Sequence, residues 1–322
     1  MPRVDSSRVL PARDGVGASC IALPPGPWPT IAAFLIDRFP AVPAADWLGR
    51  MACGDVVDEA GERVDADRGY RAHLKVYYYR HVPAEPRVPF DDTVLFQDDH
   101  IVVIDKPHFL PVTPGGRYLQ ETVLVRARRR LGIDTLSPVH RLDRETAGLV
   151  VLAVVPAERA AYHALFRHRA VEKVYEAVAA DRREVPMPQV RRSRMVESAG
   201  SFMQMAEVPG EPNAETAIAW VRACGDGQAL YRLRPLTGRR HQLRVHMAAL
   251  GLPLVNDRIY PVLWPHEADG TTQDFSRPLQ LLARSITFTD PATGQHRHFE
   301  SRLVLSAAEL GHDAPCDKED AS

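Results

Sequence analysis

The spacing of apolar and polar positions predicts two short helices and a strand before residue 85. Residues 30–40 place apolar side chains at helical spacing after Thr30, and the pattern stops at Pro40. Residues 45–57 predict a second helix that ends near Gly54, and residues 73–80 are rich in strand-forming residues. The proline-rich stretch 81–90 then marks a linker. We therefore expect a small N-terminal α/β domain over residues 1–85, with a flexible start.

From residue 91 onward, helical and strand patterns are interspersed. The helical patterns cover residues 119–132 and 240–251, and the strand patterns cover residues 99–107, 148–155, 171–180 and 228–236. Residues 285–300 predict a closing hairpin across a Pro-Ala-Thr-Gly turn. Several hairpin-like connections favour an α/β (α+β) fold, with a mixed, largely antiparallel sheet flanked by helices. We expect this large domain to span residues 86–310, followed by an acidic tail at 311–322.

Composition narrows the class of protein. The chain has 322 residues, with 45% hydrophobic and 25% charged residues, which is typical of a globular protein. Its four cysteines are scattered without a Cys-x-x-Cys pair, which argues against a disulfide scaffold or zinc module and favours a reducing, cytoplasmic location. The start does not resemble a signal peptide, and the longest apolar run is too short to span a bilayer.

The basic residues are unevenly distributed although the formal net charge is −1. Nearly all of them are arginine, and they cluster in residues 126–130, 182–194 and 232–244. Acidic residues gather instead in 54–67 and 313–320. Genome composition and solvated helix faces offer a plain explanation for arginine excess. Segregated basic segments also predict a phosphate-binding surface on a chain that is nearly neutral.

Charged residues stand where a core would normally exclude them. Residues 137–152 run from a cluster of charges directly into an apolar strand, which is costly unless the charges are paired or used. Lys173 and Tyr175 are two apart on a strand and so share a face. In residues 240–251, His241 and Arg244 lie on a different helical face from the apolar stripe.

These segments, in this order, resemble the RluA-type pseudouridine synthases. The family pattern HRLD-x-x-T-S/A-G matches His140–Gly148, K-x-Y matches Lys173 and Tyr175, and TGR-x-HQ-I/L-R-V-H matches Thr237–His246. A strand of the family's type, Asp98–Pro107, precedes them, and the resemblance covers roughly residues 91–305. It implies the pseudouridine-synthase fold and an isomerisation of uridine in RNA, which requires no redox cofactor, nucleotide or metal.

The resemblance also implies roles for particular residues. Asp143 matches the catalytic aspartate, which acts either as a nucleophile or as a base on the ribose. Arg244 matches the arginine that pairs with this aspartate, Tyr175 the aromatic that packs on the target base, and Arg141 the residue that fills the gap left by the flipped base. Further substrate contacts and loop-shaping residues are expected from Lys173, Arg239, Arg240, His241, His140, Thr146 and Gly148.

The chain departs from the family pattern at three places. The usual KPAGL is Lys106–Leu110 with His108 and Phe109, so this loop is bulkier. Asn256 replaces the glycine that usually precedes Asp257, and Leu281–Ala283 lacks the histidine of the usual LHA. None of these departures touches the expected catalytic set, but loops beside a cleft select the RNA. Arg144 and Glu145 have no assigned role, and we expect both to face solvent.

Other functions fit parts of the pattern. Asp143 and Glu145 could form the paired carboxylates of a hydrolase, and Asp143 alone could be half of a structural ion pair. A non-catalytic RNA-binding protein that retains the fold is the principal alternative, although Asp143, Tyr175 and Arg244 are all present. A metal site is disfavoured because His241 and His246 are about 140° apart on a helix.

Residues 30–80 bear a faint resemblance to an S4 RNA-binding domain. Gly54, Val56 and Gly61 follow its order, but the nearby acidic residues have the wrong sign for phosphates, and an unrelated capping module is an equal alternative. Altogether, the sequence predicts a monomeric, cytoplasmic RNA pseudouridine synthase that acts on structured rRNA or tRNA. We expect no cofactor, metal or membrane partner.

Overall fold

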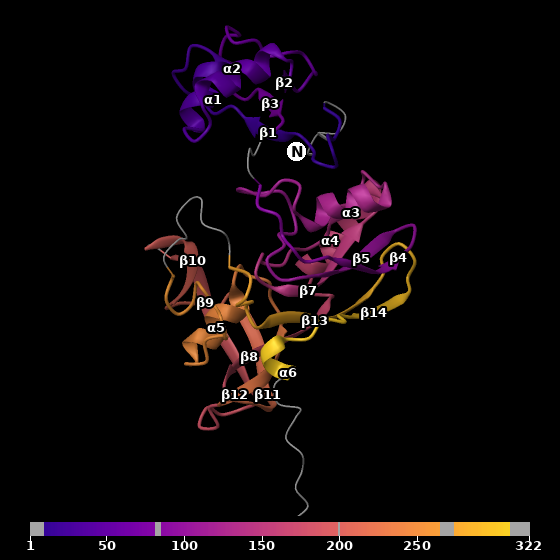
Figure 1. Cartoon of the computed structure of the whole chain (residues 1–322), viewed down its shortest axis with the longest axis vertical. Coiled ribbons are helices and arrows are strands. Elements are labelled where there is room, and N and C mark those ends of the chain that lie inside the picture. Colours follow the sequence, from indigo (N-terminus) through magenta and orange to yellow (C-terminus); the bar gives the residue numbers. More distant parts are fainter. Residues whose placement is uncertain (1–9, 81–84, 199, 265–273, 310–322) are drawn as a thin grey trace, which may run out of the picture. The chain divides into compact units, whose positions relative to one another are not determined.

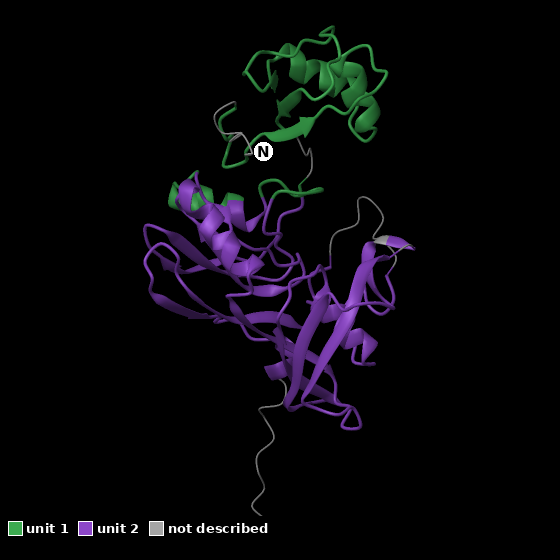
Figure 2. Ribbon diagram, turned by 180° about the vertical axis from the view of Figure 1, so that it is seen from behind, with its two compact units in different colours: residues 1–85, 114–120, 125–134 green, residues 86–113, 121–124, 135–322 purple. Residues whose placement is uncertain are grey.

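A computed structural model describes residues 10–80, 85–198, 200–264 and 274–309 of the chain (Figure 1). It contains two compact units, one of residues 1–85, 114–120 and 125–134, and one of residues 86–113, 121–124 and 135–322 (Figure 2). The short stretches 114–120 and 125–134 group with the first unit, although they lie in the range expected for the large domain. The acidic tail at 311–322 and residues 1–9 lie outside the described residues, whereas residues 19–22, within the start expected to be flexible, form a strand.

The first unit contains a small antiparallel sheet of order β1-β3-β2 with two helices. Its elements are β1 (Ser19–Ala22), α1 (Ile31–Arg38), α2 (Ala44–Ala52), β2 (Val56–Asp58) and β3 (Lys75–Tyr78). The expected cap of α1 is present, because the Thr30 side chain accepts a hydrogen bond from the backbone of Ala33 at 3.1 Å. Phe34, Leu35 and Trp47 are buried between the helices and the sheet.

Helix α3 (Val123–Leu131) begins four residues later than the periodicity predicts. The backbone N–H groups of Leu119 and Gln120 donate to the Glu85 carboxylate at 2.7 and 2.9 Å, which holds these residues outside the helix. The helix ends as expected at Gly132, whose φ of +68° an L-residue adopts only with strain. A tertiary contact therefore decided the start of the helix, and local conformation decided its end.

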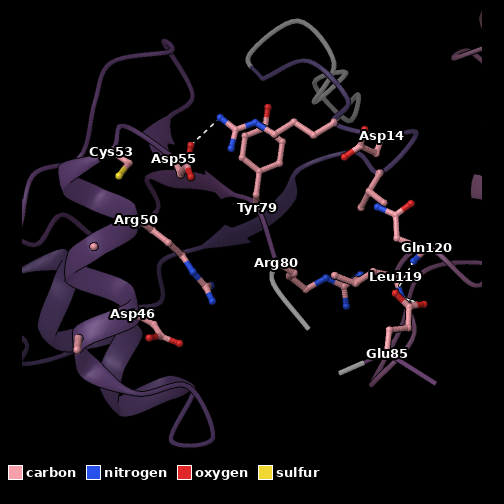
Figure 3. Close-up of a pocket in the computed structure, with 14 residues that line it drawn as sticks. Asp14, Asp46, Arg50, Cys53, Asp55, Tyr79, Arg80, Glu85, Leu119 and Gln120 are labelled. Atoms are coloured by element: carbon pink, nitrogen blue, oxygen red, sulfur yellow. Dashed lines mark hydrogen bonds and ion pairs between the residues drawn. The ribbon is translucent and has the colours of Figure 1, made fainter. Parts of the chain in front are cut away.

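A cavity of about 780 Å³ lies within the first unit (Figure 3). Arginines and carboxylates line it together, among them Arg13, Arg50, Arg80, Asp14, Asp46, Asp55 and Glu85. Arg13 donates to Asp55 at 2.6 Å, and the Glu85 carboxylate is already bound by backbone N–H groups. Its charges are thus mixed and partly paired with one another.

The second unit is built on one large sheet. Its central path runs β10-β9-β11-β12-β8-β13-β7-β5-β4, while β14 pairs with β13 and β6 pairs with β7. The strands are β4 (Thr93–Gln97), β5 (Ile101–Lys106), β6 (Ser137–Pro138), β7 (Ala147–Ala153), β8 (Glu172–Ala180), β9 (Gln189–Ser198), β10 (Ser201–Val208), β11 (Ala214–Gly225), β12 (Gln228–Pro235), β13 (Leu281–Thr289) and β14 (His296–Glu300).

The sheet is mixed and largely antiparallel, as the sequence predicts. Among the described strands, only β13 and β7 pair in parallel, through Leu282 with Ala147 and Ala283 with Gly148. The hairpin of β13 and β14 forms across the expected turn. The sequence patterns missed β9, β10 and most of β11; in β9 only Met195 is buried and three arginines interrupt the apolar positions, so no apolar alternation marks the strand.

Helices cover both faces of this sheet. Turn η2 (Pro156–Glu158) leads into α4 (Arg159–Arg167), which packs with Ile286 and Val151, and α5 (Gln242–Ala249) packs on Ala177. Helix α6 (Ser306–Glu309) packs with Val178, the next residue of β8, and therefore lies on the opposite face. No helix in the described part of the chain has the length and hydropathy needed to cross a membrane.

Gly148 is held where the parallel strands meet. Its φ is +109°, and a Cβ atom there would lie 2.3 Å from the carbonyl oxygen of Ala283. Strained backbone and steric overlap each cost about 1–3 kcal/mol. We therefore expect Gly148→Ala to lower the free energy of unfolding by about 2–4 kcal/mol, measured by urea denaturation followed by circular dichroism.

The matched control is Gly294→Ala in the turn between β13 and β14. Gly294 also has a positive φ, +73°, but a Cβ atom there would have open space around it. We expect a loss of about 1 kcal/mol from backbone strain alone. Equal losses in the two variants would contradict the proposed overlap at Ala283.

Candidate active site

Asp143 lies in the loop that connects β6 to β7. Its side chain is 31% exposed, so the carboxylate is accessible at one side and enclosed at the other. Its Oδ2 lies 3.5 Å from Nη1 of Arg244 and 3.9 Å from Nε2 of His241. The backbone N–H of Thr146 donates to the Asp143 carbonyl at 3.2 Å and closes a turn around the residue. The fold thus brings Asp143 together with two residues that lie about 100 positions farther along the chain.

Arg244 projects from α5 and is buried, with 2% of its side chain exposed. Its Nε and Nη2 donate to the two oxygens of Asp257 at 2.8 and 2.6 Å, which leaves Nη1 for Asp143. Burial alone would lower the pKa of Arg244, but hydrogen bonds and charge from Asp257, with the charge of Asp143, raise it above its usual value. The guanidinium is therefore a permanent buried cation.

Asp257 is fixed as firmly as the arginine it binds. Its side chain is fully buried, and the backbone N–H groups of Ile259 and Tyr260 donate to its Oδ1 at 2.8 and 2.9 Å. The preceding Asn256 has a φ of +62°, a conformation that Asn tolerates better than most residues. Asn256 can therefore occupy the position where the family usually has glycine.

The side chain of Gln242 determines how α5 starts. Its Oε1 accepts from the Thr237 hydroxyl at 2.7 Å and from the Arg239 backbone at 3.0 Å. Its amide nitrogen donates to the carbonyl of Glu215 and to the hydroxyl of Thr216, both at 2.9 Å. The turn before α5 is thereby attached to β11, which fixes the first turn of the helix, where Arg244 lies.

His241 enters the site from the residue before α5. Its φ is +55°, its Nδ1 lies 3.0 Å from the Tyr260 hydroxyl, and its side chain is only 10% exposed. Burial lowers the pKa of His241, while the charge of Asp143 partly opposes that effect. At neutral pH the imidazole is therefore mostly neutral, and Arg244 is the cation nearest to Asp143 among the groups described.

Tyr175 and Lys173 lie on one face of β8, as their spacing predicts. Tyr175 pairs in register with Leu233 on one side and Ala283 on the other. Burial and the charge of Asp143 raise the pKa of Tyr175, so its phenol stays protonated. Burial lowers the pKa of Lys173. The ring of Tyr175 therefore contributes a neutral aromatic surface, and its hydroxyl is close enough to interact electrostatically with the Asp143 carboxylate.

The expected loop-shaping residues have distinct places. His140 accepts a hydrogen bond from the Val151 backbone at its Nε2, at 3.1 Å, and stacks on Phe166. Burial lowers the pKa of His140 to about 3, so the ring is neutral. Thr146 is buried, and its hydroxyl has no hydrogen-bond partner among the described residues. Gly148 permits the close approach of β13 described above.

The remaining arginines lie at the surface. Arg141, Arg239 and Arg240 are all exposed. Arg239 donates through Nε to the Asn213 carbonyl at 3.1 Å, and Arg240 lies 3.7 Å from Glu197. These three side chains present positive charge outside the buried group of Asp143, Arg244 and Asp257.

The expectation that Arg144 and Glu145 face solvent is wrong for Glu145. Only 14% of its side chain is exposed, whereas Arg144 is 33% exposed. The Arg144 guanidinium donates to the Glu145 carboxylate through Nε at 2.8 Å, so the two charges neutralise each other locally. The Glu145 backbone is also held, because Nδ1 of His108 lies 2.7 Å from its carbonyl oxygen.

The sequence did not identify four residues that bind the side chains and the loop of the site. Asp257, Tyr260, Lys106 and His108 all contact members of the site, and none of them was assigned a role. The available signals were an aspartate and a tyrosine three residues apart after Asn256, and a lysine at the end of a strongly apolar strand. Neither signal identifies a partner without the fold.

The arrangement provides one carboxylate fixed by a buried cation, beside an aromatic ring and open on one side. The described part of the chain contains no cluster of three or more His, Cys, Asp or Glu residues suited to a metal ion. An ionised carboxylate in such a place can act as a nucleophile or as a base. No second carboxylate faces Asp143 within the described site, since Asp257 is bound on the far side of Arg244.

Residues 100–249 match the sequence pattern of the RNA pseudouridylate synthases. The chain is 32% identical over 230 residues to the dual-specificity RNA pseudouridine synthase RluA of Escherichia coli K12, covering 68% of this chain and 94% of that protein. It is 36% identical over 187 residues to the mitochondrial tRNA pseudouridine(32) synthase of Saccharomyces cerevisiae. That match covers 56% of this chain and 39% of the yeast protein.

A solved structure shares the fold. Human RNA Pseudouridylate Synthase Domain Containing 1 superposes with a TM-score of 0.54 at 21% sequence identity, covering 68% of this chain and 86% of the human one. At this identity the likeness establishes the fold alone. The pseudouridine-synthase fold expected from the motifs is thereby confirmed.

Removing the charge of Asp257 leaves Arg244 as a buried cation without its principal partner. Breaking a buried ion pair from one side costs about 3–5 kcal/mol. We expect Asp257→Asn to lower the free energy of unfolding by that amount, measured by urea denaturation. Asp274→Asn is the control, because Asp274 is 51% exposed and lies 3.6 Å from Arg258. Similar losses in both variants would show that burial of the pair at Arg244 is unimportant.

Buried neutral histidines make stability depend on pH. Burial lowers the pKa of His246 to about 4, and the ring is held by the hydroxyls of Ser193 and Thr216 at 3.0 Å each. Between pH 4 and 6.5 the unfolded chain therefore binds more protons than the folded one, so stability falls as pH falls through this range. One such group contributes on the order of 3 kcal/mol.

We expect His246→Gln to reduce the slope of unfolding free energy against pH between 4 and 6.5, because one proton-binding difference is removed. The measurement is urea denaturation at several pH values in wild type and variant. His168→Gln is the control, since His168 is exposed after α4. An unchanged slope in the His246 variant would mean that this histidine is protonated in the folded protein.

Proposed function

Because this chain belongs to the RNA pseudouridylate synthase family, and so is an isomerase that converts uridine to pseudouridine in RNA, we propose that Asp143 performs the reaction on a uridine of structured rRNA or tRNA. The observation that carries the role of Asp143 is its contact with the buried guanidinium of Arg244 at 3.5 Å. The yeast relative is named for a tRNA position, which supports tRNA, and the bacterial one is named for dual specificity, which supports more than one kind of RNA substrate.

The reaction sets specific demands on the site. The bond from N1 of uracil to C1′ of ribose breaks, the base turns, and C5 joins C1′. The hydrogen on C5 then leaves as a proton, and N1 gains a proton, so the product is an isomer of the substrate. The base must leave the stack for this to happen, and a carboxylate must stand beside the glycosidic bond.

Asp143 fits both versions of the chemistry. As a nucleophile its carboxylate would attack the substrate, and as a base it would remove a proton from the ribose. In both roles the carboxylate must be held in place beside the substrate, and the guanidinium of Arg244, at 3.5 Å, holds it. Arg244 does not donate a proton in the reaction, because Asp257 raises the pKa of its guanidinium.

Tyr175 and the surface arginines supply the remaining contacts in this proposal. The protonated phenol of Tyr175 presents an aromatic face on which an extruded uracil can stack. The exposed Arg141 is placed on the loop of Asp143, where it can occupy the space that the extruded base leaves. Arg239 and Arg240 precede α5, and Lys173 lies beside Tyr175, where contacts to phosphate or base are available.

The working form of the protein is proposed to be a cytoplasmic monomer without a cofactor. The scattered cysteines support a reducing compartment. An isomerisation consumes no redox equivalents, and the carboxylate, cation and aromatic ring all come from one chain. The partner is thus RNA alone.

Release of tritium from RNA labelled at C5 of uridine tests the proposal, because the C5 hydrogen must leave. We expect wild type to release tritium from cellular rRNA or tRNA and Asp143→Asn to release it at least about 10³-fold more slowly, since the amide is neither a nucleophile nor a base. Asp274→Asn is the matched control, an exposed carboxylate outside the site, and should retain full activity.

The outcomes separate the alternatives. RNA binding without tritium release by wild type would indicate a binding protein that retains the fold. Free uracil or ribose among the products would indicate a hydrolase. Release by Asp143→Asn at the wild-type rate would remove Asp143 from the mechanism while leaving the activity in place.

A further inference from the structure

Two backbone carbonyls in the Asp143 loop are held by side chains from the end of β5. Nζ of Lys106 donates to the Arg144 carbonyl at 3.1 Å. Nδ1 of His108 lies 2.7 Å from the Glu145 carbonyl. These carbonyls belong to the two residues that directly follow Asp143. The loop that bears the carboxylate is therefore attached to the sheet at two successive peptide groups.

Lys106 is an unusual residue for this purpose. It has no exposed surface, and its ammonium donates to the carbonyls of Pro107 and Leu110 at 3.0 and 2.9 Å in addition to that of Arg144. An ammonium has three hydrogens, and each has one carbonyl acceptor. A buried charge is costly, so a fully satisfied one constrains its neighbours strongly.

The loop after Lys106 is itself rigid. Phe109 adopts a φ of +67°, which is strained for a bulky residue. Its ring is buried against Phe275, with 5.2 Å between ring centroids, and the Lys106 ammonium binds the carbonyls on either side of His108 and Phe109. The segment that bears His108 is thus held at Pro107 and at Leu110 by the Lys106 ammonium.

His108 acts as a donor in this contact. A carbonyl oxygen only accepts, so Nδ1 must carry the hydrogen. Burial lowers the pKa of His108 to about 4, so the ring at neutral pH is uncharged and carries its single hydrogen on Nδ1. The contact is therefore a neutral hydrogen bond that keeps its strength across the physiological pH range.

We propose that Lys106 and His108 are positioning residues that hold the Asp143 carboxylate in line with Arg244. This inference rests on the catalytic role proposed for Asp143. The turn from Asp143 to Thr146 is closed by its own hydrogen bond, so fixing its two middle carbonyls fixes the whole turn. Displacement of a reacting group by about 1 Å can cost about 10²-fold in rate.

The hydrogen bonds that Lys106 and His108 make to the Asp143 loop, which we call the two tethers, differ in their response to pH. Burial lowers the pKa of Lys106 to about 7, although the negative charges of Glu145 and Asp143 oppose that effect and Arg144 adds to it. His108 also interacts electrostatically with the Lys106 ammonium, and its ring is neutral near pH 7. Loss of a proton from Lys106 leaves two hydrogens for three carbonyls, so the turn loosens as pH rises above about 7.

The principal test uses His108, with Ala to remove the donor and Asn to restore one near the Nδ1 position. We expect His108→Ala to lower kcat for tritium release about 10-fold, with KM for RNA within 2-fold of wild type. We expect His108→Asn to recover kcat to within about 3-fold, because its amide still donates to the Glu145 carbonyl. His168→Ala, an exposed histidine after α4, is the control and should match wild type.

Hydrogen exchange of peptides covering residues 141–147 provides a readout that does not depend on activity. We expect exchange in this segment to accelerate about 10-fold in His108→Ala and in Lys106→Met, with wild-type exchange elsewhere in β7. In wild type, exchange corrected for the intrinsic effect of pH should rise between pH 6.5 and 8.5, and in Lys106→Met this rise should vanish. If Lys106→Met does not fold, the His108 pair still decides the question.

Specific results would overturn the proposal. Wild-type kcat and exchange in His108→Ala would exclude a tether at Glu145. A raised KM with unchanged kcat would show that His108 contacts RNA instead. If wild type releases no tritium but exchange responds as expected, the tethers stand and the proposed reaction of Asp143 fails.

Discussion

The site depends on the buried guanidinium of Arg244, which binds Asp257 through two of its nitrogens and still has a third nitrogen that contacts Asp143. Asp257 takes two of the hydrogen bonds of Arg244 and compensates the cost of its burial. The remaining nitrogen faces Asp143, whose carboxylate stays partly open to solvent. Because Asp257 is held by two backbone N–H groups, this geometry is independent of substrate. The guanidinium is therefore held in position by the protein's own groups.

The histidines around the site serve as neutral hydrogen-bonding groups. Burial keeps His108, His140 and His246 uncharged near pH 7, and each binds a backbone group or hydroxyl. Added positive charge would compete with Arg244 for the carboxylate of Asp143. Because these imidazoles are neutral, none of them competes with the Arg244 guanidinium that contacts the Asp143 carboxylate.

The departures from the family pattern are accommodated by local physics. Asn256 adopts a positive φ, which its short polar side chain tolerates, and its amide donates to the Pro278 carbonyl at 3.0 Å. Phe109 adopts a similar conformation at greater strain, and burial of its ring together with the Lys106 ammonium holds it there. His108 takes the place of a smaller residue and adds a contact to the Asp143 loop. The loop is therefore supported by different side chains, while Asp143 lies in contact with Arg244.

The sequence by itself determined the helices and strands with strong periodicity and the order of the motifs, and its resemblance to the family predicted Asp143, Tyr175 and Arg244 as a set. Periodicity and motif spacing are local properties, so they can be read without the fold. Only the tertiary structure decided that Asp257 neutralises Arg244, that little of the Glu145 side chain is exposed, and that Lys106 and His108 hold the loop. These contacts join residues that are far apart in the chain, or that meet through backbone carbonyls, which every residue carries alike. The order of side chains along the sequence therefore does not reveal which residues make these contacts.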